Sequence, residues 1–196
     1  SHHRVELIRH NENRGVSAAR NSAIDVAKGD LMALLDPDDL WKPEHLTRTI
    51  DLFEKNPEVG IVAGSVEAFN DDDTNNVLPY PIKEWQITNF PASLVCNNFI
   101  QPSAVIVRRK VIIEAGYFTT DVHLQHIEDY DLWIRLAKLG VKFAFRDGAT
   151  CLYRKHANAA TSDLQKMCQL HDALIHKHLT FFVQMQGRMQ KNIFNR

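Results

Sequence analysis

A short apolar stretch that ends in clustered aspartates constrains the fold of this chain more than any other feature. Leu31 to Leu35 are all apolar, and Asp36, Asp38 and Asp39 follow them around Pro37. A short apolar run between turn residues is typical of an inner strand of a parallel sheet, with both faces buried. Ligands of open α/β sheets bind at the carboxyl ends of the strands. The sequence therefore predicts that these carboxylates lie where a ligand would bind.

The chemistry of this acidic cluster suits a divalent cation. Three carboxylates so close in sequence repel one another, and a bound cation would offset the repulsion. Carboxylate oxygens are ligands for Mg²⁺ or Mn²⁺, which commonly bind substrate phosphates at the same time. The alternative is a solvated loop, in which Asp36 begins a turn and Asp39 caps the next helix. The four-residue pattern alone leaves both interpretations open.

The composition is that of one ordinary globular domain or slightly more. The chain has 196 residues, 44% of them hydrophobic and 24% charged, and a net charge of −1. This balance gives no general electrostatic reason to bind nucleic acid. We expect a cytoplasmic location, because no apolar stretch approaches the ~20 residues that cross a bilayer and no signal peptide opens the chain. The three cysteines include no Cys-x-x-Cys pair and are expected to be reduced.

The order of hydrophobic patterns predicts an α/β fold. In the first half we expect a strand at 4–9, a helix at 16–28, a strand at 31–35, a helix ending at 56 and a strand at 59–69. This alternation favours right-handed crossovers and a mostly parallel sheet flanked by helices. Residues 70–76 are expected to be a polar loop, and 79–96 an irregular connector with three prolines.

The hydrophobic pattern of the second half of the sequence predicts further strands and helices and a C-terminal helical extension. We expect a strand within 99–107, a short helix that stops at Gly116, a helix at 128–139, and short strands at 141–145 and 150–153. Residues 163–194 have the spacing of one long amphipathic helix or a helix pair. We therefore divide the chain into a domain at 1–162 and a C-terminal extension at 163–196. Packing of the extension on the domain or on another subunit is favoured over membrane binding, because its basic residues are few.

A second acidic element opens the helix predicted at 128–139. Glu128, Asp129 and Asp131 lie in its first turn, where the helix dipole favours negative charge. Taken alone, this element is more simply explained as helix capping. With two acidic clusters in one domain, one cluster could hold a metal while the other supplies a base. His156 follows a strand and is a candidate metal or phosphate contact, although surface histidines are more common.

Four motifs, in order, resemble those of family 2 glycosyltransferases of the GT-A fold. They are Asn13-Arg14-Gly15-Val16-Ser17-Ala18-Ala19-Arg20-Asn21 with Ala27-Lys28-Gly29-Asp30, then Leu35-Asp36-Pro37-Asp38-Asp39-Leu40-Trp41, Glu128-Asp129-Tyr130-Asp131-Leu132-Trp133, and Tyr153-Arg154-Lys155-His156. The resemblance covers residues 5–162, and four ordered motifs are far more specific than one. It implies a GT-A-type sheet and an inverting, metal-dependent transfer of sugar from a nucleotide-diphospho-sugar.

The resemblance also implies a role for each candidate acid. Asp36 and Asp38 match the family's Asp-x-Asp motif, with Asp38 the more direct ligand of the Mn²⁺ or Mg²⁺ that bridges the donor diphosphate. Asp39 would support the turn. Asp129 matches the general base that deprotonates the acceptor hydroxyl, and Glu128 would bind acceptor or tune Asp129.

The remaining candidates follow from the same resemblance. Arg20 matches a position near the nucleotide-phosphate portion of the donor, Asn13 and Gly15 shape the loop beside it, and His156 matches a late metal or diphosphate contact. The implied partners are a UDP-sugar donor and a saccharide or lipid-linked acceptor, in cell-surface polysaccharide or glycoconjugate synthesis. Peripheral attachment at the inner face of the membrane is a further expectation. Trp85, Phe90 and Phe99 could stack on an acceptor sugar or fill the core.

The chain departs from the family at its N-terminal side. We find no Asp-Gly-Ser segment of the kind that grips the nucleobase, and the first strand, helix and second strand of the family have no counterpart here. We therefore expect an exposed edge at the 31–35 strand: either the sequence is a fragment, or a partner chain, a second copy or a rearranged segment covers that edge. The alternative function is a non-catalytic remnant or fragment that acts as a binding or assembly module. Metal-dependent phosphoryl transfer is disfavoured, since the chain lacks a glycine-rich phosphate loop.

Overall fold

The computed structural model describes residues 5–70, 73–155 and 163–194, and its centre is a six-stranded sheet. The strand order is β1-β5-β3-β6-β2, and β4 also pairs with β3. The strands are β1 (Leu31–Ala33), β2 (Leu40–Trp41), β3 (Val59–Asn70), β4 (Asp73–Tyr80), β5 (Val105–Arg108) and β6 (Lys142–Lys155). The predicted α/β class is confirmed.

The directions of the strands correct one part of the prediction. The β3–β6 pair is parallel, whereas the β1–β5, β3–β5, β3–β4 and β2–β6 pairs are antiparallel, so the sheet is mixed and not mostly parallel. An apolar run indicates that both faces of a strand are buried, but it carries no information on direction. The chain reaches β5 through the irregular segment 81–104 and not through a crossover helix of ordinary length, which lets β5 run antiparallel to β3.

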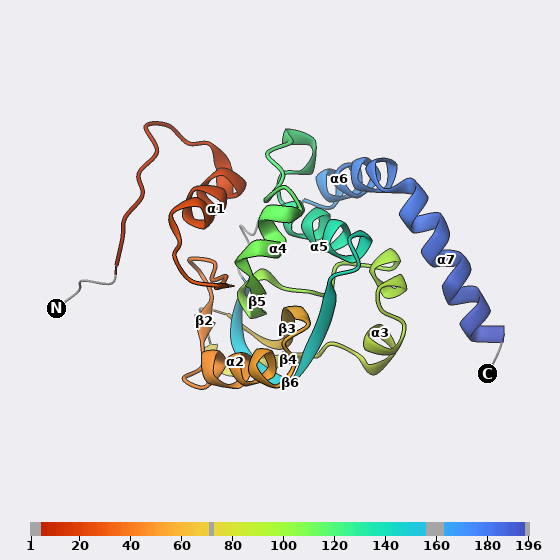
Figure 1. The fold of residues 1–196 in the computed structure, drawn as a ribbon, viewed down its shortest axis with the longest axis horizontal. Coiled ribbons are helices and arrows are strands. Elements are labelled where there is room, and N and C mark those ends of the chain that lie inside the picture. The colour runs from red at the N-terminus through yellow and green to blue at the C-terminus, as the bar shows by residue number, and fades with distance from the viewer. Residues whose placement is uncertain (1–4, 71–72, 156–162, 195–196) are drawn as a thin grey trace.

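Helices cover both faces of the sheet (Figure 1). They are α1 (Gly15–Val26), α2 (His45–Lys55), α3 (Glu84–Thr88), α4 (Arg109–Glu114), α5 (Glu128–Lys138), α6 (Leu164–Lys177) and α7 (Leu179–Phe194), with short 3-10 turns η1 (Ala92–Val95), η2 (Pro102–Ala104) and η3 (Val122–Leu124). On one face, Phe53 of α2 packs on Val62 and Ile106. On the other face, Ile112 of α4 and Leu132 of α5 belong to the main core.

The C-terminal extension forms two helices that share this main core. Leu170 and Leu174 of α6 and Phe181 and Phe182 of α7 belong to the same buried cluster as Trp133 of α5. The prediction that the extension packs on the domain is confirmed. No helix in the described part of the chain is both long and apolar enough to span a membrane.

Three local expectations were wrong. Residues 5–10 form no strand, and Val5 and Leu7 are exposed, because no described strand lies beside them. Residues 73–80, which fall in the expected loop and at the start of the expected connector, form strand β4, which makes a hairpin with β3. The two short strands expected at 141–153 are one strand, β6, whose register shifts near Gly148.

Two further expectations concerned an exposed sheet edge and the packing of Trp85, Phe90 and Phe99. Within the described residues β1 pairs only with β5, so its other edge is open. Phe90 and Phe99 pack against Phe143 and Phe145 and fill the core, whereas Trp85 of α3 stays 41% exposed.

A buried histidine makes the fold sensitive to acid. His45 is 1% exposed, its Nδ1 lies 2.8 Å from Thr150 Oγ1, and its ring stacks on Trp41. Burial, followed by the charge of Arg146, lowers the pKa of His45 from 6.5 to about 4. The unfolded chain therefore binds more protons than the folded chain between these values, and stability falls as pH drops through this range.

We expect His45 alone to remove about 2.5 kcal/mol of unfolding free energy between pH 7.5 and pH 4.5. Urea unfolding of the wild-type protein and of His45→Gln at the two pH values measures this share, since glutamine does not titrate. An equal pH dependence in both proteins would show that His45 is not the acid-sensitive group.

Candidate active site

Arg20 of α1 joins the two acidic clusters. Its Nη2 lies 2.5 Å from Asp36 Oδ1, and its Nη1 lies 2.9 Å from Glu128 Oε1. The side chains of Arg20 and Glu128 are 13% and 7% exposed, and that of Asp36 is 29% exposed. Desolvation opposes the charge of Arg20, but Asp36 and then Glu128 outweigh it and raise the pKa of the guanidinium. One cation thus brings the turn after β1 against the first residue of α5.

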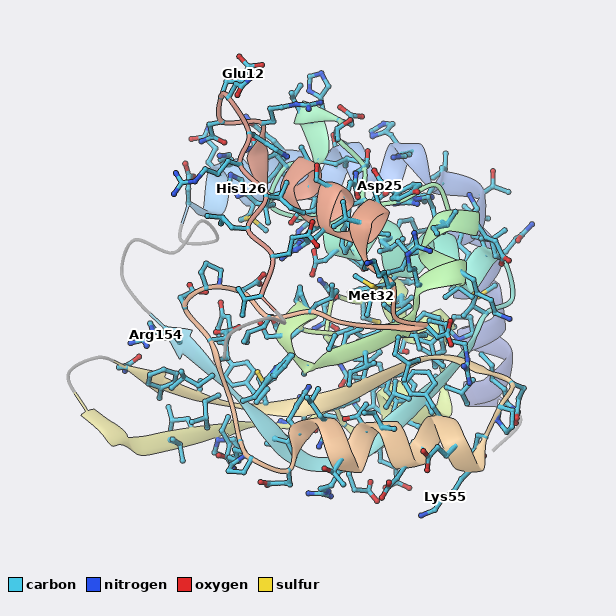
Figure 2. All side chains as sticks on the ribbon, turned by 60° about the vertical axis from the view of Figure 1, so that its left-hand side comes forward. Glu12, Asp25, Met32, Lys55, His126 and Arg154 are labelled. Carbon is cyan, nitrogen blue, oxygen red and sulfur yellow. The ribbon has the colours of Figure 1, made fainter. Side chains whose placement is uncertain are left out.

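The acidic turn is fixed by contacts with distant segments. The backbone N–H of Asp36 donates to Ser103 Oγ at 3.0 Å, and that of Asp39 donates to Asp36 O at 3.1 Å. Arg154, at the end of β6 in Figure 2, donates its backbone N–H to Asp39 Oδ1 and its Nε–H to the carbonyl of Asp38. Asp39 is 6% exposed, and burial raises the pKa of its carboxyl group. Asp39 therefore holds the turn, and Asp36 and Asp38 are the half-buried carboxylates of the loop.

Asp129 is a buried carboxylate with a raised pKa. It is 8% exposed, and its Oδ2 accepts a 2.9 Å hydrogen bond from Asn98 Nδ2. Burial, followed by the charge of Glu128, raises the pKa of Asp129 to about 7, against the opposing effects of Arg20 and Asn98. A carboxylate with a pKa near the working pH is suited to general base catalysis.

Glu128 is occupied by structural contacts. Its Oε1 binds Arg20, and its Oε2 accepts a 2.8 Å hydrogen bond from the backbone N–H of His126, which lies beside α1 in Figure 2. Of the two neighbouring acids, Asp129 is thus the better candidate base, and Glu128 orients Arg20.

The third acid of this element has a different environment. Asp131 is 0% exposed and its carboxylate contacts Arg135 Nε at 2.8 Å, Lys177 Nζ at 2.8 Å and His178 Nε2 at 2.9 Å. Burial disfavours its charge, but the bonds from His178, Lys177 and Arg135 outweigh that effect and hold the pKa of Asp131 well below its usual range. Asp131 therefore binds the α6–α7 junction to α5 and takes no part in the Arg20 contact.

Asn13 and Gly15 line a cavity of about 420 Å³ at the N-terminal end of α1. Asn13 Oδ1 accepts a 2.9 Å hydrogen bond from the backbone N–H of Gly15, whose φ of +80° favours glycine. Residues 119–122 and Gln125 also line the cavity. These two candidates thus shape the start of α1, and Arg20 lies further along the same helix.

The predicted metal site draws on Asp36, Asp38 and His156. His156 lies outside the described residues, directly after β6, and its role stays a prediction. Within 5–70, 73–155 and 163–194 no group of three or more His, Cys, Asp or Glu side chains could hold a metal ion. Asp36 and Asp38 supply two carboxylates on one turn, and Mg²⁺-type ions commonly use one or two carboxylates together with substrate phosphates and water. The donor set therefore fits an ion that arrives with a diphosphate.

Three residues of the site were missed by the sequence analysis. Ser103 and Asn98 come from the irregular segment 81–104, and only the folded chain brings them to Asp36 and Asp129. Arg154 lies within one of the four quoted motifs, so the sequence could have singled it out. Its contacts with the acidic turn could not be predicted from the sequence.

Comparison with known sequences finds a matching family and several relatives. A sequence model described as Glycosyl transferase family 2 matches residues 1–116. The amylovoran biosynthesis glycosyltransferase AmsB of Erwinia amylovora is 31% identical over 146 residues, which are 71% of this chain and 47% of that protein. AmsE of the same organism is 27% identical over 129 residues, 66% of this chain and 46% of that protein. The chain spans about half the length of these curated relatives.

Solved structures share the fold. The mannosyltransferase PcManGT from Pyrobaculum calidifontis, in complex with GDP-Man and Mn²⁺, matches with a TM-score of 0.59 and 18% identity, over 87% of this chain and 46% of that one. S. aureus TarS 1–349 in complex with UDP matches with a TM-score of 0.55 and 16% identity, over 85% of this chain and 52% of that one. At these identities the likeness shows the fold alone, and that fold is the GT-A fold predicted from the motifs. From its family match and its relatives, this chain belongs to glycosyltransferase family 2.

Proposed function

We propose that this chain carries the donor site and the catalytic base of a metal-dependent, inverting glycosyltransferase. The observation that supports this most directly is the Arg20 contact, which brings the Asp36 turn and the start of α5 around one guanidinium. Donor activation needs positive charge near a diphosphate, and acceptor activation needs a base. Arg20 and Asp129 supply these two elements within one site.

In the proposed reaction Asp129 takes the proton of the acceptor hydroxyl. The oxygen of that hydroxyl forms a bond to the anomeric carbon as the bond from this carbon to the diphosphate oxygen breaks. Direct displacement inverts the configuration of the sugar, and the nucleoside diphosphate leaves. Asp36 and Asp38 are the residues that would hold Mn²⁺ or Mg²⁺, with His156 as a further candidate. When bound, such an ion stabilises the charge that develops on the leaving diphosphate.

The donor and acceptor are inferred from relatives and neighbours. TarS was solved with UDP and PcManGT with GDP-Man, which supports a nucleotide-sugar donor, and a UDP-sugar is our first candidate. The amylovoran relatives support a saccharide or lipid-linked acceptor in polysaccharide synthesis. A cytoplasmic location with peripheral attachment at the inner face of the membrane fits such acceptors. The open edge of β1 favours coverage by a second copy or by further polypeptide.

Calorimetric titration of UDP into this chain tests the donor site. With Mn²⁺ present we expect binding that is lost, or weakened at least tenfold, in Asp38→Ala, because the ion loses a carboxylate ligand. Asp51→Ala is the matched control, since it removes the same charge from an exposed position of α2. Binding of equal strength without Mn²⁺, or in Asp38→Ala, would contradict a metal-bridged diphosphate. Absence of binding by folded protein would favour the alternative of a non-catalytic remnant or fragment.

A further inference from the structure

The segment 94–100 is attached to helix α5 at three points. The Tyr130 hydroxyl donates to the carbonyl of Leu94, and Trp133 Nε1 donates to the carbonyl of Ile100 at 3.2 Å. Between them, Asn98 Nδ2 donates to Asp129 Oδ2 at 2.9 Å. Leu94 and Ile100 are 0% exposed, so both ends of the segment are buried in the core. The contact between Asn98 and Asp129 thus lies in the middle of a segment that is held at either end.

The orientation of the Asn98 amide is determined by the backbone. Its Oδ1 accepts a 3.2 Å hydrogen bond from the N–H of Ile100. A backbone N–H can only donate, so the oxygen of the amide must face Ile100 and the NH₂ group must face Asp129. Asn98 therefore presents a donor to Asp129, and its amide cannot flip without losing both bonds.

We propose that Asn98 is a positioning residue that fixes the orientation of the Asp129 carboxylate and stabilises its ionised form. The inference rests on the proposed function, in which Asp129 is the catalytic base. A hydrogen bond to an ionised group is stronger than one to a neutral group, so the donor favours the state that can accept a proton. The amide does this without adding charge to the site.

The charged groups that act on Asp129 come from two helices. Glu128, on the same helix, disfavours ionisation of Asp129, and Arg20 of α1 favours it. Glu128 and Asp36 both bind Arg20, so the positive charge of Arg20 is shared among the acids of the site. Asn98 acts on Asp129 through its hydrogen bond and belongs to the 94–100 segment, not to either of these helices.

Carbon-detected NMR of protein with ¹³Cγ-labelled aspartate tests the proposal without any substrate. The Asp129 signal is assigned by its loss in Asp129→Asn and is followed from pH 4.5 to pH 9. We expect Asn98→Ala to raise the pKa of Asp129 by about one unit. The hydrogen bond from Asn98 stabilises the ionised carboxylate more than the neutral carboxyl group, so its loss destabilises the ionised form more. Asn98→Asp should raise it further, since this variant keeps an acceptor for Ile100 but places a negative charge against Asp129.

Asn97→Ala is the matched control. It changes the same residue type one position away, at an exposed site whose contact with Gln86 Nε2 is long, at 3.5 Å. We expect Asn97→Ala to leave the pKa of Asp129 unchanged. The indole N–H signal of Trp133 shows in each variant that the segment is still attached to α5.

An unchanged pKa of Asp129 in both Asn98 variants, with the Trp133 signal intact, would overturn the role of Asn98. The proposed function is tested separately by the activity of Asp129→Asn. If Asp129→Asn keeps its activity, Asp129 is not the base, whatever the NMR titration shows for Asn98. If activity is lost and the Asn98 titrations match the wild type, only the inference about Asn98 fails.

Discussion

Replacing Asp129 by asparagine is expected to lower turnover of a nucleotide-sugar donor by about 10²- to 10⁴-fold, the usual contribution of a general base. Asparagine has the same shape and can keep a hydrogen bond to Asn98, but it cannot accept a proton from a hydroxyl. We expect kcat to fall while the affinity for nucleoside diphosphate stays within about twofold, since Asp129 does not hold the donor. Release of nucleoside diphosphate measures the first quantity, and calorimetric titration measures the second.

The pH dependence of the wild-type protein has a defined sign. The pKa of Asp129 is raised to about 7, so the base is protonated and inactive below this value and active above it. Turnover should therefore fall tenfold per pH unit on the acid side of about 7. Glu128→Gln is the comparison variant: it should shift this limb to lower pH, because Glu128 raises the pKa of Asp129. Full activity of Asp129→Asn would exclude Asp129 as the base, and an acid limb near the ordinary aspartate pKa would contradict its raised pKa.

Replacing Asp131 by alanine is expected to cost about 3–5 kcal/mol of unfolding free energy, the range for removing one partner of a buried ion pair. Asp131 is 0% exposed and contacts Arg135, Lys177 and His178. His178 is 3% exposed, so it would be left buried without an acceptor on its Nε2 side. Because the contact joins α5 to the α6–α7 junction, the loss should also loosen the helices that complete the core. Urea unfolding at pH 7 measures the difference.

Asp172→Ala provides the control for this prediction. Asp172 also lies near a histidine, His176, at 3.7 Å, but both side chains are more than 70% exposed. Exposed pairs contribute little, so we expect a change within about 0.5 kcal/mol. The pKa of Asp131 is lowered in the folded chain, so its contribution is present above the ordinary aspartate pKa and is lost only as pH falls through the lowered value. A loss below about 1 kcal/mol in Asp131→Ala would show that the buried contacts do not hold the extension.

Local hydrophobic patterns predicted several of the elements. The helix at 16–28, the helix ending at 56 and the strand at 59–69 correspond to α1, α2 and β3, because periodicity reports which side of an element is buried. Strand direction is set by the connection between strands and by long-range pairing. These local patterns therefore could not predict the antiparallel direction of β5 or the hairpin strand β4.

The same distinction between local patterns and long-range contacts applies to the candidate site. Residue type and motif order singled out Asp36, Arg20 and Glu128, and the fold brings these three together. Asp129 and Asp131 lie two positions apart in one motif, yet one faces the site and the other faces His178. The resemblance singled out Asp129, and a step of two positions along a helix turns the side chain to another face. The partners of Asp131 could not be predicted, because they depend on where α6 and α7 pack. Asn98 was missed for the same reason, since its partner lies in a distant helix.

The most direct test of the account is release of nucleoside diphosphate from UDP-glucose, UDP-galactose, UDP-N-acetylglucosamine and GDP-mannose by this 196-residue chain. Water can serve as acceptor, so the measurement does not depend on knowing the natural one. We predict release from at least one donor in the presence of Mn²⁺, which stops when EDTA removes the ion and falls at least a hundredfold in Asp129→Asn. Release that persists in EDTA, or folded protein that turns over none of these donors, would contradict a metal-dependent transferase in this chain.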